Sequence, residues 1–473
     1  MEYKSWLPLL VMAGFETVQL EENAYELTLH TKEDFNYLKQ LFNDANVNYL
    51  DCGNRVYPSI EDSHWFSFPF SYFIEIIEMP IETDLWVKHS INATRGGYES
   101  GSSPDTLPLM SVEPHIRAIF SQIRRFGLSM IETCEGHDKG KRIPYNYPHL
   151  IFDKFIDARI AQKLICNSGF KAELLDPKFL RINESKENLM ALGLKLSELR
   201  NTEDYYKQES LEKEERLIKL LSIPGTSGNE ELVSDKVLET LGEITGTNSV
   251  VCGGNIQGEL RKSTEKAILL SAHMDVYDEF SPGAPIVKQE NCLHRPGNIL
   301  GADDRAGIAI ILDVLRFFSE YKNGYSIKYL FTASEEYPPH GVENVDPAFF
   351  ENVEFALSLD RKGCRDIVHK HGSIEYSSRE FAEKISQISR NLFGSNDAFS
   401  PCEGGISDLR YWSELGIESV NLSIGYSDEH THDESLDLSC WNQTYELVLE
   451  IIGSEYEQFS RDRFHQQMNK RKP

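Results

Sequence analysis

The chain has 473 residues, of which 40% are hydrophobic, and it carries a formal net charge of −27 at pH 7. This length suggests about two or three domains with buried cores, and the apolar content argues against wholesale disorder. Because so acidic a chain repels phosphate backbones, the charge argues against nucleic acid as a partner.

The N-terminal apolar run, Trp6 to Phe15, is short and has only Lys4 as a basic flank. It therefore fits neither a signal peptide nor a membrane span. The eight cysteines are scattered along the chain without a Cys-x-x-Cys pair, which is typical of reduced thiols and not of a disulfide framework. We therefore expect a cytoplasmic protein that binds no membrane. The sequence leaves a homo-oligomer open.

We interpret residues 1–200 as a separate α/β domain without an assigned role. An apolar face recurs at helical spacing over 112–126, and Gly127 is a typical stop. The strand-like segment 128–133 then leads to Cys134-Glu135-Gly136-His137. A Cys and a His three positions apart can begin a metal or thiol site. Since no second Cys/His pair with finger spacing accompanies them, a strand-to-loop turn is the favoured interpretation.

Residues 201–473 predict a second domain in which strands and helices alternate. The charged segment 201–216 is either a linker or the exposed start of a helix that ends before Pro224-Gly225. Continuous apolar strands that alternate with helices predict an α/β fold with a mainly parallel (mixed) sheet covered by helices on both faces. The predicted strands are 248–252, 267–272, 327–333, 355–359 and 417–424, and the predicted helices are 229–244, 304–320, 378–393 and 440–458.

Carboxylates or imidazoles follow the predicted strands of this second half. Taken singly, such a His or Glu is more often solvent-facing, and an Asp that opens a helix is more often an N-cap. In open α/β sheets, however, sites form at the carboxyl ends of the strands, so their coincidence favours one shared site. The residues are His273 and Asp275, Asp303 and Asp304, Glu335 and Glu336, Asp360, and His430 and His432.

A cluster of carboxylates at one sheet edge requires a compensating cation. Imidazole and carboxylate ligands without cysteine suit Zn²⁺ or a similar divalent ion. Two metals about 3.5–4 Å apart, bridged by one carboxylate, can activate a water and polarise a carbonyl. Five ligands and one free base suffice for such a centre, and the sequence supplies that number.

In this order, the motifs of residues 205–460 resemble the co-catalytic zinc exopeptidases, the clan of the M28 aminopeptidases and the M20 peptidases and deacylases. Residues 1–200 lie outside the resemblance. The motifs are LIKLLSIPGTSGNEE, GGNIQGEL, SAHMDVYD, NILGADDRAGIAIIL, LFTASEEYPPHG, ALSLDRKG, EGGISDLRYWSELGIESVNLSIG and EHTHDESLDL.

The resemblance implies a role for each matching residue. His273 and Asp360 would bind one zinc, Glu336 would bind the other, and Asp303 would bridge both. Asp275 would orient the His273 ring through its other nitrogen, and Asp304 would cap the following helix. Glu335 would be the general base that takes a proton from the water held between the metals. Two divalent ions are implied, with Zn²⁺ favoured and Co²⁺ or Mn²⁺ as alternatives.

The last ligand is ambiguous in the sequence. The family pattern is a His followed four residues later by an acid, which His430 and Glu434 satisfy. His432 gives the rival register. We expect His430.

The resemblance implies hydrolysis of an amide in a small peptide or an N-acylated amino acid. Only 70 positions separate Asp360 from His430 and only 30 separate His273 from Asp303, so the lid or dimerisation insertions of related groups are not expected. This compact core favours an M28-type aminopeptidase. An N-acyl amino acid deacylase or a carboxypeptidase is the alternative, and it requires a cation for the substrate carboxylate. Candidates for that cation are Arg361, Lys362 and Arg410. The rival from another class is a non-catalytic binding protein on this scaffold.

Overall fold

The computed structural model describes residues 114–134 except 129, 148–199 except 177, and 203–453 with gaps at 247–248, 261–265, 282, 320–325 and 339. It also describes residues 11, 16–21, 24–28, 39, 49–51 and 56–58. The chain forms two compact units, Met1–Gln208 and Glu209–Pro473.

The described strands β5 to β8 of the N-terminal unit form an antiparallel sheet in the order β5-β6-β8-β7. The predicted helix at 112–126 is confirmed as α4 (Pro114–Arg125), and Gly127 follows it with φ +77°. Strand β5 (Met130–Cys134) confirms the strand-like segment, but residues 135–137 of the Cys134–His137 motif lie outside the described residues. The other elements are β1 (Glu16–Glu21), β2 (Ala24–Thr28), β3 (Tyr49–Asp51), β4 (Val56–Pro58), β6 (His149–Phe152), α5 (Phe155–Asn167), β7 (Ala172–Asp176), β8 (Phe179–Ile182) and α6 (Lys186–Glu198).

The charged segment is helical over its described residues, 203–216. It belongs to α7 (Glu203–Leu221), so the helix interpretation is confirmed and the linker interpretation is wrong. Most of the other predicted helices of the C-terminal unit appear within about two residues of their expected bounds. They are α8 (Glu231–Thr245), α9 (Ala302–Ser319), α10 (Arg379–Phe393) and a helix over 438–453, and the short α11 (Leu409–Ser413), η3 (Gly341–Asn344) and η4 (Pro347–Phe350) join them.

The described strands of the C-terminal unit build a mixed nine-stranded sheet, which confirms the predicted α/β class. Its centre runs β19-β15-β11-β14 with every neighbouring pair parallel. The outer strands add antiparallel pairs: β9 and β10 beyond β14, and β16 with β17 beyond β19, while β18 lies parallel to β16. The strands are β9 (Val250–Cys252), β10 (Asn255–Leu260), β11 (Ala267–His273), β14 (Ser326–Thr332), β15 (Val353–Arg361), β16 (Asp366–His371), β17 (Ile374–Glu375), β18 (Ser400–Glu403) and β19 (Glu418–Ser423).

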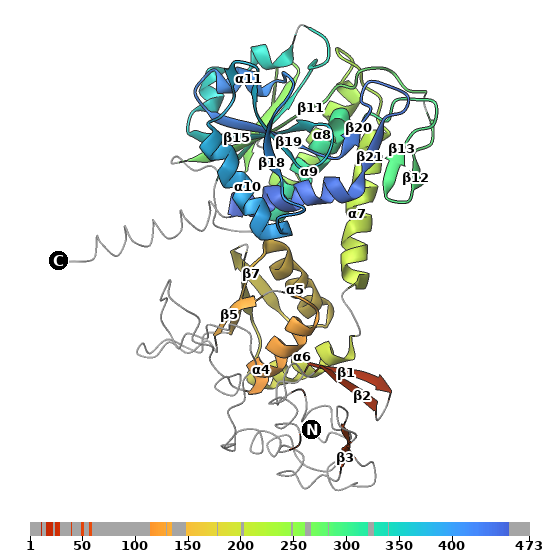
Figure 1. Cartoon of the computed structure of the whole chain (residues 1–473), viewed down its shortest axis with the longest axis vertical. Coiled ribbons are helices and arrows are strands. Elements are labelled where there is room, and N and C mark those ends of the chain that lie inside the picture. The colour runs from red at the N-terminus through yellow and green to blue at the C-terminus, as the bar shows by residue number, and fades with distance from the viewer. Residues whose placement is uncertain are drawn as a thin grey trace, which may run out of the picture. The chain divides into compact units, whose positions relative to one another are not determined.

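Helices pack against both faces of the central strands (Figure 1). On one face, Leu269 and Ala356 join a buried cluster with Trp412 of α11. Because side chains alternate along a strand, Ile268 and Leu270 point to the other face, where α9 packs on β11, β14 and β15. No helix of the described residues is long and apolar enough to cross a membrane.

A small sheet lies beside the C-terminal ends of the central strands. Its order is β12-β13-β21-β20, with all described pairs antiparallel. This sheet was not predicted, because each of its strands has only two or three residues, too few to show a period. The strands are β12 (Val287–Gln289), β13 (Cys292–His294), β20 (Tyr426–Ser427) and β21 (Ser435–Asp437).

The prediction that the cysteines are reduced thiols is wrong for Cys364 and Cys440. The two form a disulfide across 76 positions, with Cα atoms 5.5 Å apart. Cys364 lies in the turn after β15 and Cys440 in the helix over 438–453. Only the fold brings these two residues together, so the pair could not be predicted from their spacing along the chain. The described cysteines Cys166, Cys252, Cys292 and Cys402 are free.

Candidate metal centre

His273 ends strand β11 and is almost fully buried. Its two ring nitrogens face different partners. Nδ1 lies 3.0 Å from the backbone oxygen of Asp275 and 3.3 Å from Asp275 Oδ1. Nε2 lies 3.0 Å from Asp303 Oδ1 and 3.6 Å from Asp360 Oδ1. One edge of the imidazole is therefore fixed, and the other faces two carboxylates.

Asp303 lies between the two histidines. Its Oδ1 faces His273, and its Oδ2 lies 3.3 Å from His430 Nε2. The same His430 nitrogen is 2.8 Å from Glu336 Oε1. Two groups of potential ligands result, His273–Asp303–Asp360 and Asp303–Glu336–His430, each with its ligand atoms within 4.8 Å of one another. Asp303 belongs to both groups, as a bridging carboxylate must.

The backbone around Asp303 is held by a buried carboxylate from a distant part of the chain. Glu434 accepts hydrogen bonds from the N–H groups of Gly301 (2.7 Å), Ala302 (2.7 Å) and Asp303 (3.1 Å). These are free donors at the start of α9, where a negative charge is favourable. Asp304 accepts from Gly307 N at 3.2 Å, as expected of a cap, and also from His273 N at 3.1 Å.

A local irregularity of strand β15 presents Asp360. The register between β15 and β19 shifts between Ser358 and Arg361, and such shifts re-aim side chains. The side chain of Asn421 takes the place of backbone hydrogen bonds between β15 and β19 at this point. It accepts from Asp360 N at 2.9 Å and donates to Asp360 O at 2.6 Å. The buried Tyr426 hydroxyl donates to Asp360 Oδ1 at 3.3 Å.

The loop after β14 is held by two carboxylates from other segments. Asp275 accepts from Glu335 N and Glu336 N, both at 3.0 Å, and from Ser227 Oγ at 2.6 Å. Glu230 accepts from the N–H and the hydroxyl of Ser334, at 2.9 and 3.2 Å. Because its backbone is anchored on both sides, the loop directs Glu335 and Glu336 into the same space.

Negative charge is in excess in this buried space. Burial raises the pKa of Glu335 to about 9, and the neighbouring carboxylates of Asp360, Asp408 and Glu336 add to the shift. Burial also raises the pKa of Asp360 to about 7, with Asp303 and Glu336 contributing. The hydrogen bonds with Asp303 and Glu336 raise the pKa of His430 to about 10. Acids that hold protons and an imidazole that stays charged both indicate a site that favours positive charge.

The residues present fit divalent metal ions. All five candidate ligands, His273, Asp303, Glu336, Asp360 and His430, offer nitrogen or oxygen, and no cysteine belongs to either group. Such a donor set suits zinc, with other first-row divalent ions able to substitute. Because Asp303 belongs to both groups, it could bind two neighbouring ions, one through each group.

A cavity of about 150 Å³ opens beside these ligands. Besides its histidines, the lining contains two basic residues, and each faces a carboxylate: Arg361 Nε is 3.3 Å from Asp366 Oδ2, and Lys362 Nζ is 2.6 Å from Glu429 Oε1. Arg410 is not in the lining and pairs with Glu414 at 2.7 Å. The lining comprises His273, Asp303, Glu335, Glu336, Asp360, Arg361, Lys362, Val368, Gly405, Ile406, Ser407, Asn421, Tyr426, Glu429 and His430.

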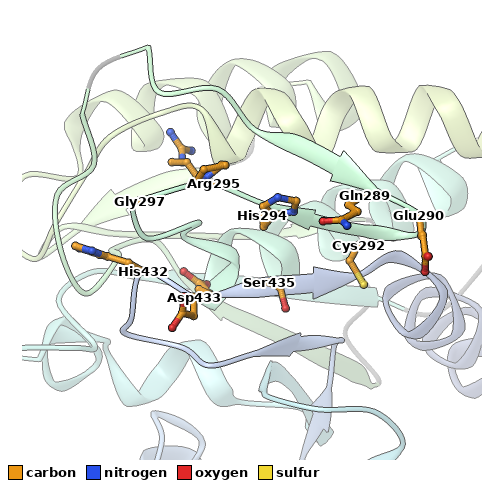
Figure 2. A pocket seen from close by; sticks show the side chains of 11 residues that line it. Gln289, Glu290, Cys292, His294, Arg295, Gly297, His432, Asp433 and Ser435 are labelled. Carbon is orange, nitrogen blue, oxygen red and sulfur yellow. The ribbon is translucent and has the colours of Figure 1, made fainter.

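The structure separates the two histidines of the rival registers. His430 lines the cavity beside Glu336, whereas His432 lines a second cavity of about 490 Å³ next to the β12-β13 hairpin. Figure 2 shows His432 at the edge of this second cavity, near Asp433 and apart from His294. Of the two, only His430 is brought to Asp303 and Glu336.

Sequence reasoning assigned no role to Ser227, Glu230, Asn421 and Tyr426. Ser227 and Glu230 lie within LIKLLSIPGTSGNEE, a segment noted only for its resemblance to the zinc exopeptidases. Asn421 lies within a predicted strand, where a side chain that replaces backbone hydrogen bonds leaves no pattern. A buried amide at a strand register shift is visible only in the structure.

Comparison with known proteins places the ligand groups within one family domain. The model of peptidase family M28 matches residues 255–452. Carboxypeptidase G2 of Pseudomonas sp. (strain RS-16) is 26% identical over 220 residues, which cover 44% of this chain and 50% of that protein. The chain thus spans about half the length of this curated relative.

Solved structures also resemble the C-terminal half. Aminopeptidase PepT from Bacillus cereus has a TM-score of 0.42 and 16% identity, covering 51% of this chain and 98% of that one. A tripeptidase from Staphylococcus aureus has a TM-score of 0.44 and 17% identity, covering 51% and 97%. The family match includes all five candidate ligands and Glu335, so residues 255–452 are similar to peptidase family M28.

Proposed function

We propose that this chain is a metal-dependent exopeptidase, specifically an aminopeptidase that hydrolyses an amide bond of small peptides. One observation carries the proposal: two groups of metal ligands share Asp303 and lie with Glu335 around one cavity of the M28-like region. A non-catalytic binding protein would not require a free carboxylate beside both groups.

We propose that His273 and Asp360 hold one divalent ion and that Glu336 and His430 hold another, with Asp303 shared. Zinc suits this donor set, and Co²⁺ or Mn²⁺ are alternatives. When bound, such ions would polarise the scissile carbonyl and make a water more acidic.

Glu335 is the proposed proton carrier. It lines the cavity and is not a member of either ligand group. Its backbone N–H is fixed by Asp275, so the carboxyl group has a defined position. A carboxylate there can take a proton from the attacking water and return it to the leaving amine. Asp275 would act by holding His273, Glu335 and Glu336 in place.

The charges of the cavity favour a substrate with a free amino group. Its lining contains more acids than cations, and both lining cations, Arg361 and Lys362, face carboxylates. A substrate carboxylate would have to compete with Asp366 or Glu429 for these partners. A free amino group needs neither Arg361 nor Lys362 and meets no such competition.

A carboxypeptidase is the second candidate, because the curated relative bears that name. An N-acyl amino acid deacylase would bind its substrate in the same way, through the carboxylate. Both alternatives require Arg361 or Lys362 to leave its acidic neighbour and bind substrate.

Two matched dipeptides separate these functions. Leucyl-alanine amide has a free amine and a blocked carboxyl group, whereas acetyl-leucyl-alanine has the reverse. The aminopeptidase proposal expects turnover of the first substrate only, its loss with a chelator and its recovery with added Zn²⁺. Parallel assays of Glu335→Gln control for contaminating peptidases. Turnover of the acetylated substrate alone would favour the carboxypeptidase, and metal-loaded protein that cleaves neither would favour a binding protein.

The cellular location and the domain division remain predictions. We propose that residues 201–473 act as the catalytic domain without a lid insertion. Between Asp360 and His430, the described elements β16 to β19 are strands of the central sheet, and α10 and α11 pack against them.

A cytoplasmic location was predicted from the scattered cysteines, and the Cys364–Cys440 disulfide weighs against that argument because disulfides are rare in reducing compartments.

A further inference from the structure

His430 has less local support than the other candidate ligands. It lies on the loop between β20 and β21, and 37% of its side chain is exposed, against 2% for His273. Its backbone has φ +63°, a left-handed conformation that is uncommon outside glycine. A ligand on such a loop needs a contact that fixes the direction of its ring.

The usual contact for this purpose is a hydrogen bond to the nitrogen that does not bind metal. His273 has that support, since Nδ1 faces Asp275 while Nε2 faces the other carboxylates. For His430, the polar contacts found among the described residues all involve Nε2, the nitrogen that faces Glu336 and Asp303. The orientation of this ring therefore has to come from something other than a hydrogen bond at Nδ1.

The face of the His430 ring is covered by Tyr277. The two ring centroids lie 4.3 Å apart, and the ring planes differ by 10°. Tyr277 in turn contacts Tyr337, with ring centroids 5.4 Å apart and ring planes that differ by 32°. Parallel stacking fixes the plane of a flat ring without occupying either nitrogen.

This aromatic contact joins the loops that carry the ligands. Tyr277 follows Asp275 by two positions on the loop after β11, and Tyr337 directly follows Glu336 on the loop after β14. The ring of His430, on the third loop, stacks on Tyr277. Both tyrosines stay partly exposed, at 36% and 47%, so burial of apolar surface does not account for their arrangement.

We propose that Tyr277 is a positioning residue for the Asp303–Glu336–His430 site, and that its ring holds the His430 imidazole in the orientation that binds the metal. The inference rests on the proposed function, because it assumes that this group binds a metal. Loss of an outer partner of a metal ligand typically costs about 10–100-fold in metal affinity. We expect about tenfold here, confined to one of the two sites.

The test is a Zn²⁺ titration of chelator-treated full-length protein by calorimetry with a competing chelator. Tyr277→Phe keeps the flat ring and loses only the hydroxyl, whereas Tyr277→Leu keeps an apolar side chain and loses the flat ring. The His430→Ala variant shows which of the measured Zn²⁺ affinities belongs to this site. Leu415→Ala, which truncates a side chain that is 49% exposed and outside the cavity lining, controls for loss of surface apolar area.

We expect Tyr277→Leu to lower the Zn²⁺ affinity about tenfold, and only at the site whose binding His430→Ala abolishes. We expect Tyr277→Phe to bind both ions with the affinities of the wild-type protein. Combined with His430→Ala, Tyr277→Leu should have no further effect on the remaining site. Equal binding by the Leu and Phe variants overturns the inference, as does an effect of Tyr277→Leu that persists without His430. If the wild-type protein binds no Zn²⁺ ion that His430→Ala fails to bind, the proposed function itself fails. This result differs from each of the outcomes that would overturn only the role of Tyr277.

Discussion

The carboxylate of Asp275 accepts a hydrogen bond at 3.0 Å from the backbone N–H of Glu335, the residue proposed as general base. The sequence had assigned Asp275 only to the His273 ring. In the structure this fully buried carboxylate also accepts from Glu336 N and Ser227 Oγ. Asp275 thus contacts His273, a proposed ligand of the first site, and the backbones of Glu336, a proposed ligand of the second, and Glu335, the proposed base.

We predict that Asp275→Asn lowers kcat/KM by about 10–100-fold, the range for outer partners of metal ligands. An amide offers one acceptor oxygen, so at least one of the donors that now meet this carboxylate would lose its partner in a buried space. Steady-state kinetics on metal-loaded protein measures the loss. Asp278→Asn is the matched control, because Asp278 is exposed on the same loop. Equal effects of both substitutions would contradict the role of Asp275.

We predict that Glu335→Gln keeps the fold and the metal content but loses about 10²–10⁴-fold in kcat, the usual contribution of a general base. Glutamine has a similar shape and cannot carry the proton. Elemental analysis and circular dichroism confirm intact protein, and kinetics measures the loss. Glu429→Gln, at another acid of the cavity lining, provides the comparison. A Glu335→Gln variant that turns over like wild type would remove this residue from the mechanism.

We predict that His430→Ala loses about one equivalent of bound metal, whereas His432→Ala retains both, since only His430 lies beside Asp303 and Glu336. The two histidines share one loop, so the pair controls for general disturbance of that loop. Metal content after dialysis gives the answer. The opposite result would restore the rival register.

The central sheet could be predicted because its strands are mostly apolar, although β14 includes the buried Lys328. All residues of β11 and β14 are buried, which matches unbroken runs such as AILLSA. Strand β9 was predicted from the same kind of run, but its residues are all exposed and it is the outermost strand of its sheet. An apolar run of three residues does not distinguish a central strand from an edge strand.

That the candidate ligands gather could be predicted in part, because His273 and Asp360 lie at the carboxyl ends of neighbouring parallel strands, which share one edge of the sheet. Among the residues that hold these candidates, Asp275 was assigned to His273 from the resemblance, but the contacts of Glu434 and Asn421 could not be predicted. Glu434 reaches the N–H of Asp303 across 131 positions, and Asn421 reaches Asp360 across 61. Such contacts depend on chain segments that meet only in the folded molecule, and neither has a local sequence signal.

The disulfide gives the last prediction. Cys364 and Cys440 close a loop of 76 positions between the turn after Asp360 and the helix over 438–453. In the chain-entropy account, a cross-link of this length stabilises the folded state by about 4 kcal/mol, and measured values are commonly about 2–4 kcal/mol. For a unit of this size, that corresponds to a melting temperature about 4–16 °C lower in the Cys364→Ala/Cys440→Ala variant.

Differential scanning calorimetry measures the shift, and Cys252→Ala, at a free and exposed cysteine, is the control. A reductant should lower the melting temperature of wild type toward that of the double variant and leave the double variant unchanged. If peptide mapping without reductant finds no Cys364–Cys440 cross-linked peptide, or if the double variant melts like wild type, the link does not stabilise this fold.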